Sequence, residues 1–189
     1  KITSYKYRPG RWGILSAGAI FSVLLLANLL ANYHPYLIIA PSTIGLLLII
    51  GYIKYRLIKY ISLFEIVSFS LYSLLLVASI IFEEVNTFED SRYTTLFFAV
   101  YLLATWLFNK PVLFGYIKYD YRSDYTRTKL FKKMASGLTF IWGFLFLIIS
   151  VMNFAFLSTY ATLSYYLVVM GIYLMYYYPT TYIKGNIVK

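Results

Sequence analysis

The chain has 189 residues, of which 61% are hydrophobic and 13% are charged. Soluble domains are typically about 45–50% apolar and about 25% charged, so this composition excludes an ordinary soluble domain and indicates an integral membrane protein. The chain has no cysteine, which excludes disulfides, iron–sulfur clusters and zinc sites built on thiolates. A net charge of +10 suits either nucleic acid or an anionic membrane surface, and its placement along the chain favours the membrane.

We predict an all-α fold, a single integral membrane bundle of six transmembrane helices. The expected spans cover about 13–32, 36–53, 60–82, 93–109, 134–157 and 162–178. Each has about the 17–25 residues needed to cross a bilayer. The first is longer than the apolar region of a signal peptide, so we expect a retained helix. Pro179 is expected to end the last span.

The placement of basic residues predicts the orientation of the chain. All but one of the 17 lysines and arginines fall in the termini or in connections on one side of the expected bundle. The other side carries Arg92 and the acidic stretch EEVNTFED at 83–90. Because positive residues concentrate on the cytoplasmic side, we expect both termini and the loop 110–133 to be cytoplasmic and 83–92 to be external. The expected location is the cell (plasma or inner) membrane.

The fourth expected span stops at Lys110 and Pro111. A lysine stem can extend to the headgroups from a helix end, and proline cannot continue the hydrogen-bond ladder. The following apolar residues recur at helical spacing, which predicts a short amphipathic segment lying along the interface. These residues are Val112, Leu113, Tyr116 and Ile117. We interpret Lys110 as an interfacial anchor, with a binding role as the alternative.

Glu65 is the only acidic residue within an expected span. Intramembrane ionisable residues usually face the bundle interior or a cavity. Ser62, Glu65 and Tyr72 lie on one helical stripe, and Asn28 and Asn153 from other spans would complete a polar seam. The seam is interpreted as hydrogen bonds between helices, and the alternative is a proton-linked or small-solute site at Glu65. We favour structural pairing.

The cytoplasmic loop after the fourth span interleaves basic residues with tyrosines. This alternation can bind single-stranded nucleic acid, but beside a bilayer it more often holds anionic headgroups. We therefore predict contacts with anionic lipids at the cytoplasmic face, with a protein partner as the alternative and no nucleic acid. The candidate residues are Lys110, Lys118, Arg122, Arg127, Lys129, Lys132 and Lys133.

From residue 36 to residue 157, the order of features resembles the bacterial septation protein A family. The shared features are the basic link YIKYRLIKY at 52–60, the acidic loop EEVNTFED, Trp106 followed by Lys110-Pro111, and Trp142 with Asn153 eleven residues later. The chain departs from the pattern at Asn109, where a second basic residue is expected. The resemblance implies a small polytopic protein of cell-envelope maintenance and division that contacts other membrane proteins.

Catalytic motifs are lacking in the sequence. It contains no Walker loop, HExxH or GxSxG pattern, and the single histidine, His34, is too little for a haem or zinc site. We therefore predict a non-enzymatic protein without cofactors, a scaffold of the septation protein A-like type with membrane-protein partners. The alternatives are an accessory subunit of a larger membrane complex, such as a respiratory one, and a small transporter that uses Glu65.

Overall fold

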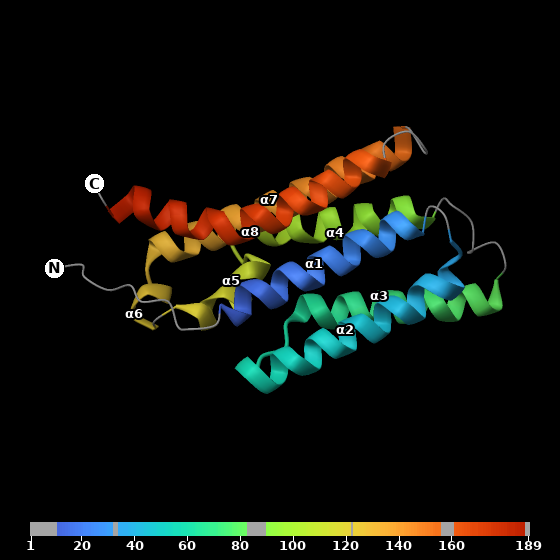
Figure 1. Ribbon diagram of the computed structural model, residues 1–189, viewed down its shortest axis with the longest axis horizontal. Helices are drawn as coiled ribbons and strands as arrows, with labels where there is room; N and C mark the ends of the chain where they lie inside the picture. The colour runs from blue at the N-terminus through green and yellow to red at the C-terminus, as the bar shows by residue number, and fades with distance from the viewer. Residues whose placement is uncertain (1–10, 32–33, 83–89, 122, 156–160, 188–189) are drawn as a thin grey trace.

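The computed structural model describes residues 11–31, 34–82, 90–121, 123–155 and 161–187, and all regular structure in these ranges is helical (Figure 1). The acidic stretch 83–89 and Arg122 lie outside the described residues. The elements are α1 (Trp12–Leu30), α2 (Tyr36–Ile58), α3 (Leu63–Ile81), α4 (Asp90–Leu107), α5 (Val112–Ile117), η2 (Lys118–Asp120), α6 (Ser123–Thr126), α7 (Lys129–Ala155) and α8 (Ala161–Ile187).

Four helices, α1, α2, α3 and α7, are long and apolar enough to cross a membrane. A fifth candidate arises if Arg92–Leu107 and Val112–Asp120 are taken as one broken span, which is bent by 75°. α8 is not among the candidates found within the described residues. The prediction of a helical membrane bundle is confirmed at this level, with four or five candidate spans where the sequence predicts six.

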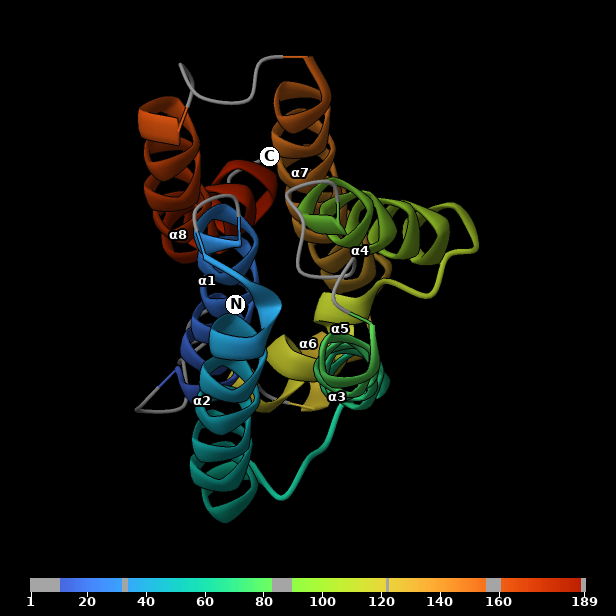
Figure 2. The same cartoon turned by 90° about the vertical axis from the view of Figure 1, so that its right-hand side faces the viewer.

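The first helix lies at the centre of the bundle. It contacts α2 on one side and α8 on the other, and it also touches α4, α5 and η2 (Figure 2). The core around it is aromatic: the ring of Phe21 lies 4.8 Å from that of Phe64 in α3 and 4.9 Å from that of Trp142 in α7. All three side chains are fully buried, so rings from three helices meet at one point.

Segments far apart in the sequence gather at one end of the molecule. The starts of α1, α3 and α7, the ends of α2 and α8, and the short elements α5, η2 and α6 all lie there (Figure 1). Lys54, Lys118 and Lys132 belong to these segments, and we call this the basic end. The opposite end carries the start of α2 and the start of α4.

Two expected helix ends are wrong. The second helix continues beyond residue 53 to Ile58, so Lys54 and Arg56 lie in a helix and not in a connection. The last helix runs through Pro179 to Ile187. A proline inside a helix removes one hydrogen bond from the ladder, which can bend the helix without ending it.

The fourth helix ends in a Schellman motif. Asn109 has a φ of 55°, and its N–H donates to the Trp106 carbonyl at 3.1 Å while the N–H of Lys110 donates to the Thr105 carbonyl at 2.9 Å. Asparagine is the commonest substitute for glycine at this left-handed position. Asn109 therefore suits the left-handed position at which α4 ends.

The short amphipathic segment after Pro111 is helical, as its spacing predicts, and its apolar face is buried within the protein. Leu113, Tyr116 and Ile117 of α5 are fully buried, because the helix packs between α1 and α7. The Leu113 N–H donates to Thr139 Oγ1 of α7 at 3.3 Å. The apolar face of α5 therefore meets protein, and its position at the membrane interface stays a prediction.

Asp120 joins this inserted segment to the start of α1. Its carboxylate accepts the N–H of Gly13 at 2.8 Å and that of Ile14 at 2.7 Å, and the side chain is almost fully buried. The first N–H groups of a helix have no partner within it, so Asp120 supplies one. A Cβ on Gly13 would lie 2.1 Å from the Tyr116 carbonyl oxygen, so glycine permits this close approach.

We predict that Asp120→Ala destabilises the bundle by about 1–3 kcal/mol, because two buried N–H groups lose their acceptor. Asp120→Asn keeps one acceptor oxygen and should lose less. Thermal unfolding of the purified variants in one detergent measures the difference. Equal stability of Asp120→Ala and the unmodified protein would contradict this role.

Candidate functional site

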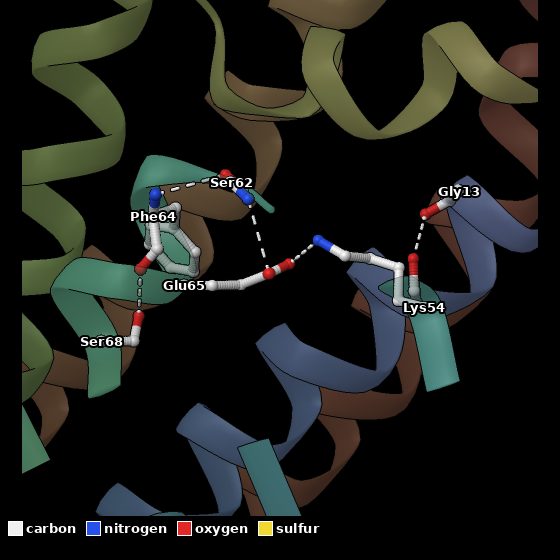
Figure 3. A network of polar contacts seen from close by, with 7 residues as sticks. Gly13, Lys54, Ser62, Phe64, Glu65 and Ser68 are labelled. Carbon is white, nitrogen blue, oxygen red and sulfur yellow. Dashed lines mark hydrogen bonds and ion pairs between the residues drawn. The ribbon is translucent and has the colours of Figure 1, made fainter. Parts of the chain in front are cut away.

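The only ion pair among the described residues joins Lys54 of α2 to Glu65 of α3. Lys54 reaches across from α2 and Glu65 points towards it from the start of α3 (Figure 3). The Lys54 side chain is fully buried and that of Glu65 is 12% exposed. A buried charge is costly without a partner, so the pair connects the two helices.

The second oxygen of Glu65 belongs to the N-terminal cap of α3. Ser62 Oγ accepts the N–H of Phe64 at 3.2 Å, and the N–H of Ser62 donates to Glu65 Oε2 at 3.5 Å. This is a capping box, which the pattern Ser-x-x-Glu before an apolar run predicts. The prediction of an acid within the third span did not use this signal in SLFE, which places Glu65 in the first turn of α3.

Two tyrosine rings flank the Lys54 ammonium group. Its Nζ lies 4.9 Å from the ring centre of Tyr60 and 4.7 Å from that of Tyr116, distances at which cations are attracted to the ring face. Burial raises the pKa of the Tyr60 phenol, so this ring stays neutral beside the charge. A Cβ on Gly115 would lie 2.0 Å from Tyr60 Oη, so the absence of a side chain there makes room for the ring.

Beyond Tyr60 and Ser62 lies a hollow of about 640 Å³, bounded by α3, α4, α5, η2 and α7. It is lined by Lys110, Lys118 and Lys132, and we call it the basic hollow. A smaller hollow of about 210 Å³ shares Lys132 and adds Lys129 and Lys133. Five of the predicted lipid-contact residues therefore gather at these two adjoining sites.

The remaining predicted basic contacts are placed differently. Arg127 is exposed between α6 and α7 and lines neither hollow. Arg122 lies outside the described residues. The sequence did not indicate Lys54, because it directly follows residue 53, where the expected second span ends, and reads as part of a basic connection.

The predicted polar seam divides into two parts. Ser62 and Glu65 meet at the basic end, whereas Asn28 lies near the far end of α1 and Asn153 near the far end of α7. Tyr72 is buried farther along α3, in stacking contact with Phe98 of α4 at 6.4 Å. The five residues do not form one continuous line through the bundle.

Most polar side chains within the helices bond to their own backbone. The Asn28 amide donates to the Leu24 carbonyl at 2.8 Å, and the Ser68 hydroxyl donates to the Phe64 carbonyl at 2.7 Å. One exception is Tyr36 of α2, whose hydroxyl lies 3.0 Å from Thr94 Oγ1 of α4. The extent of hydrogen bonding between helices at the expected seam stays a prediction.

A separate groove of about 380 Å³ runs between α2 and α3 and reaches Glu65. Its lining is almost entirely apolar and comes from these two helices and the link between them, with Leu47, Ile66 and Phe69 among its residues. The groove therefore belongs to one helix pair and does not cross the centre of the bundle.

We predict that Lys54→Met destabilises the protein by about 3–5 kcal/mol, because Glu65 remains as an uncompensated buried charge. The double variant Lys54→Met/Glu65→Gln should recover much of that loss, since no charge is left unpaired. Arg56→Met is the matched control, because Arg56 is exposed on the same helix. Unfolding midpoints in detergent form the double-mutant cycle, and additive losses would contradict a coupled pair.

Comparisons with protein-family models, with curated proteins and with solved structures find no match to this chain. The resemblance to the septation protein A family therefore stays a prediction that rests on the sequence features alone. The site is assigned from its own geometry: a buried ion pair, a neighbouring pair of tyrosines and a hollow lined by lysines.

Proposed function

We propose that this chain is a non-enzymatic, multi-pass protein of the cell membrane that acts as a scaffold in the cell envelope, with its basic end held against the anionic cytoplasmic leaflet. The observation that carries the proposal is the gathering of five lysines around two adjoining hollows at one end of the bundle. Each lysine near an anionic surface contributes about 1 kcal/mol of attraction. Anionic lipids and neighbouring membrane proteins are the expected partners.

The proposed topology has six spans. They comprise the four long apolar helices, the broken span made of α4 and α5, and α8, and both termini lie in the cytoplasm. The distribution of basic residues supports this orientation through the positive-inside rule. The exposed outer residues of α3 support contact with lipid, since Leu74 and Ile80 are 67% and 68% exposed and both are apolar.

An accessory subunit of a larger membrane complex is the second candidate. The wide apolar faces of α2 and α3 favour it, because they could cover another helical subunit as well as lipid. A transporter at Glu65 receives less support. Its carboxylate is engaged by Lys54 and by the N–H of Ser62, and the groove beside it lies on one helix pair.

The absence of cysteine makes the topology directly testable. We predict that Ser123→Cys, in α6 at the basic end, reacts with a membrane-impermeant maleimide only after the cells are permeabilised. His34→Cys, in the exposed turn between α1 and α2, should react in intact cells. Labelling of Ser123→Cys from outside intact cells would contradict the cytoplasmic basic end.

The scaffold proposal predicts which molecules accompany the protein out of the membrane. After extraction into native nanodiscs, the protein should carry a higher ratio of anionic to zwitterionic lipid than the bulk membrane. Replacing the five lysines of the two hollows with glutamine should return that ratio to the bulk value, because the attraction is electrostatic. Mass spectrometry measures the lipids in the same sample.

A bulk lipid ratio around the unmodified protein would contradict the proposal. Other membrane proteins recovered at fixed stoichiometry, together with loss of this chain when they are deleted, would favour the accessory-subunit candidate instead. The exposed pair Arg56→Gln/Arg127→Gln serves as the control for a general change in charge.

A further inference from the structure

The basic hollow has two chemically different halves. One half is cationic and is formed by Lys110, Lys118 and Lys132. The other half is apolar and is contributed by the start of α3, the end of α4 and α5. Its residues include Leu63, Phe64, Tyr101, Val112 and Phe114. A single hollow of about 640 Å³ thus offers both cationic and apolar contacts.

Among the described residues, no acid forms an ion pair with the lysines of this hollow. Within the described ranges, the only ion pair is the one between Lys54 and Glu65, which leaves the three lysines of the hollow without a carboxylate at salt-bridge distance. Lys118 is held by two rings, with its Nζ 5.0 Å from the centre of Tyr60 and 4.9 Å from that of Tyr119. The Lys118 ammonium group is therefore already positioned before any ligand binds.

The apolar half continues to the outer surface of the bundle. Leu63, at the first position of α3, lines the hollow and is 67% exposed. Tyr101 and Thr105 line it from the last turns of α4 and are half-buried. A hydrocarbon chain can therefore leave the hollow between α3 and α4, where the Thr105 hydroxyl already donates to the Leu102 carbonyl at 2.8 Å.

We propose that the basic hollow binds one amphiphile that has a phosphate head and a hydrocarbon chain. The head lies among Lys110, Lys118 and Lys132, and the chain follows the apolar lining between α3 and α4. A phosphomonoester fits best, because it carries about two negative charges at neutral pH and ammonium–phosphate hydrogen bonds are charge-assisted. The proposal rests on the proposed function, since it requires the basic end to face a leaflet.

The first experiment compares ligands on the purified full chain in neutral detergent. Native mass spectrometry measures binding of phosphatidic acid, phosphatidylglycerol and phosphatidylcholine, and inorganic phosphate is added separately as a competitor. We expect phosphatidic acid to bind most tightly, phosphatidylcholine least, and inorganic phosphate to compete only weakly because it lacks the chain. If inorganic phosphate binds as tightly as phosphatidic acid, the hollow is a site for free phosphate, and the proposal that its ligand is an amphiphile is wrong.

The second experiment removes the charges of the hollow. The variant Lys110→Gln/Lys118→Gln/Lys132→Gln should weaken phosphatidic acid binding by about a hundredfold, on the basis of about fivefold per lysine. The matched control Arg56→Gln/Lys59→Gln/Arg127→Gln removes the same net charge from exposed positions that do not line the hollow. It should weaken binding by less than about tenfold.

A third pair of variants fills the hollow without changing its charge. Thr105→Phe places a ring in the apolar half and should abolish tight binding of phosphatidic acid. Val100→Phe makes the equivalent change on the lipid-facing side of the same helix, where Val100 is 57% exposed, and should leave binding unchanged. Circular dichroism and gel filtration of all variants confirm that the bundle is intact.

The outcomes separate the two proposals. Preference of the unmodified protein for anionic lipids, with equal weakening in both triple variants, would overturn the binding site and leave the scaffold proposal standing. No preference for anionic lipids in the unmodified protein would overturn both. The binding site is supported if phosphatidic acid binding falls strongly in the triple lysine variant of the hollow and in Thr105→Phe, but not in the two controls.

Discussion

The fold of the basic end depends on the hydrogen bonds that the first N–H groups of α1 donate to the Asp120 carboxylate. A helix that starts inside a protein must find acceptors for these groups outside its own ladder. Because Asp120 supplies them from η2, the inserted segment α5–η2 is fixed beside α1. That position brings Tyr116 against Lys54 and places Lys118 next to Tyr60. One capping interaction thus positions both a ring beside the ion pair and a lysine of the basic hollow.

Packing in the rest of the bundle relies on shape more than on polar contacts between helices. The serine and asparagine side chains of the spans largely bond to carbonyls of their own helix, which satisfies them without a neighbour. Rings from four helices make the contacts instead, with Phe64 lying 5.7 Å from Phe98 of α4 as a further example. In hydrocarbon, helix association depends chiefly on such close packing, and the aromatic composition of this chain supplies it.

The sequence predicts the long elements well and their ends poorly, for identifiable physical reasons. Apolar length alone locates α1 and α3 to within three residues at either end. It misses the end of α2, because a lysine with a buried acidic partner can stay inside a helix. It leaves the partner of α5 open, because a period of 3.6 residues identifies the apolar face but not whether that face meets lipid or protein.

The sequence predicts only part of the candidate site. Clusters of lysine are visible in the sequence, and five of them do lie together. The pairing of Lys54 with Glu65 and the role of Gly115 depend on contacts between segments, which no local pattern encodes. The capping box at Ser62 was the one local signal that identifies Glu65 as a residue of the first helical turn.

The cap of α1 also has a consequence for the order of assembly. The two partners in the bond from Gly13 to Asp120 are 107 residues apart. At translation rates of about 5–20 residues per second, Gly13 is synthesised about 5–20 s before its acceptor. During that interval water or lipid headgroups must solvate the first N–H groups of α1. The closing of the basic end is therefore a post-insertion event, which begins only when the second half of the chain has been made.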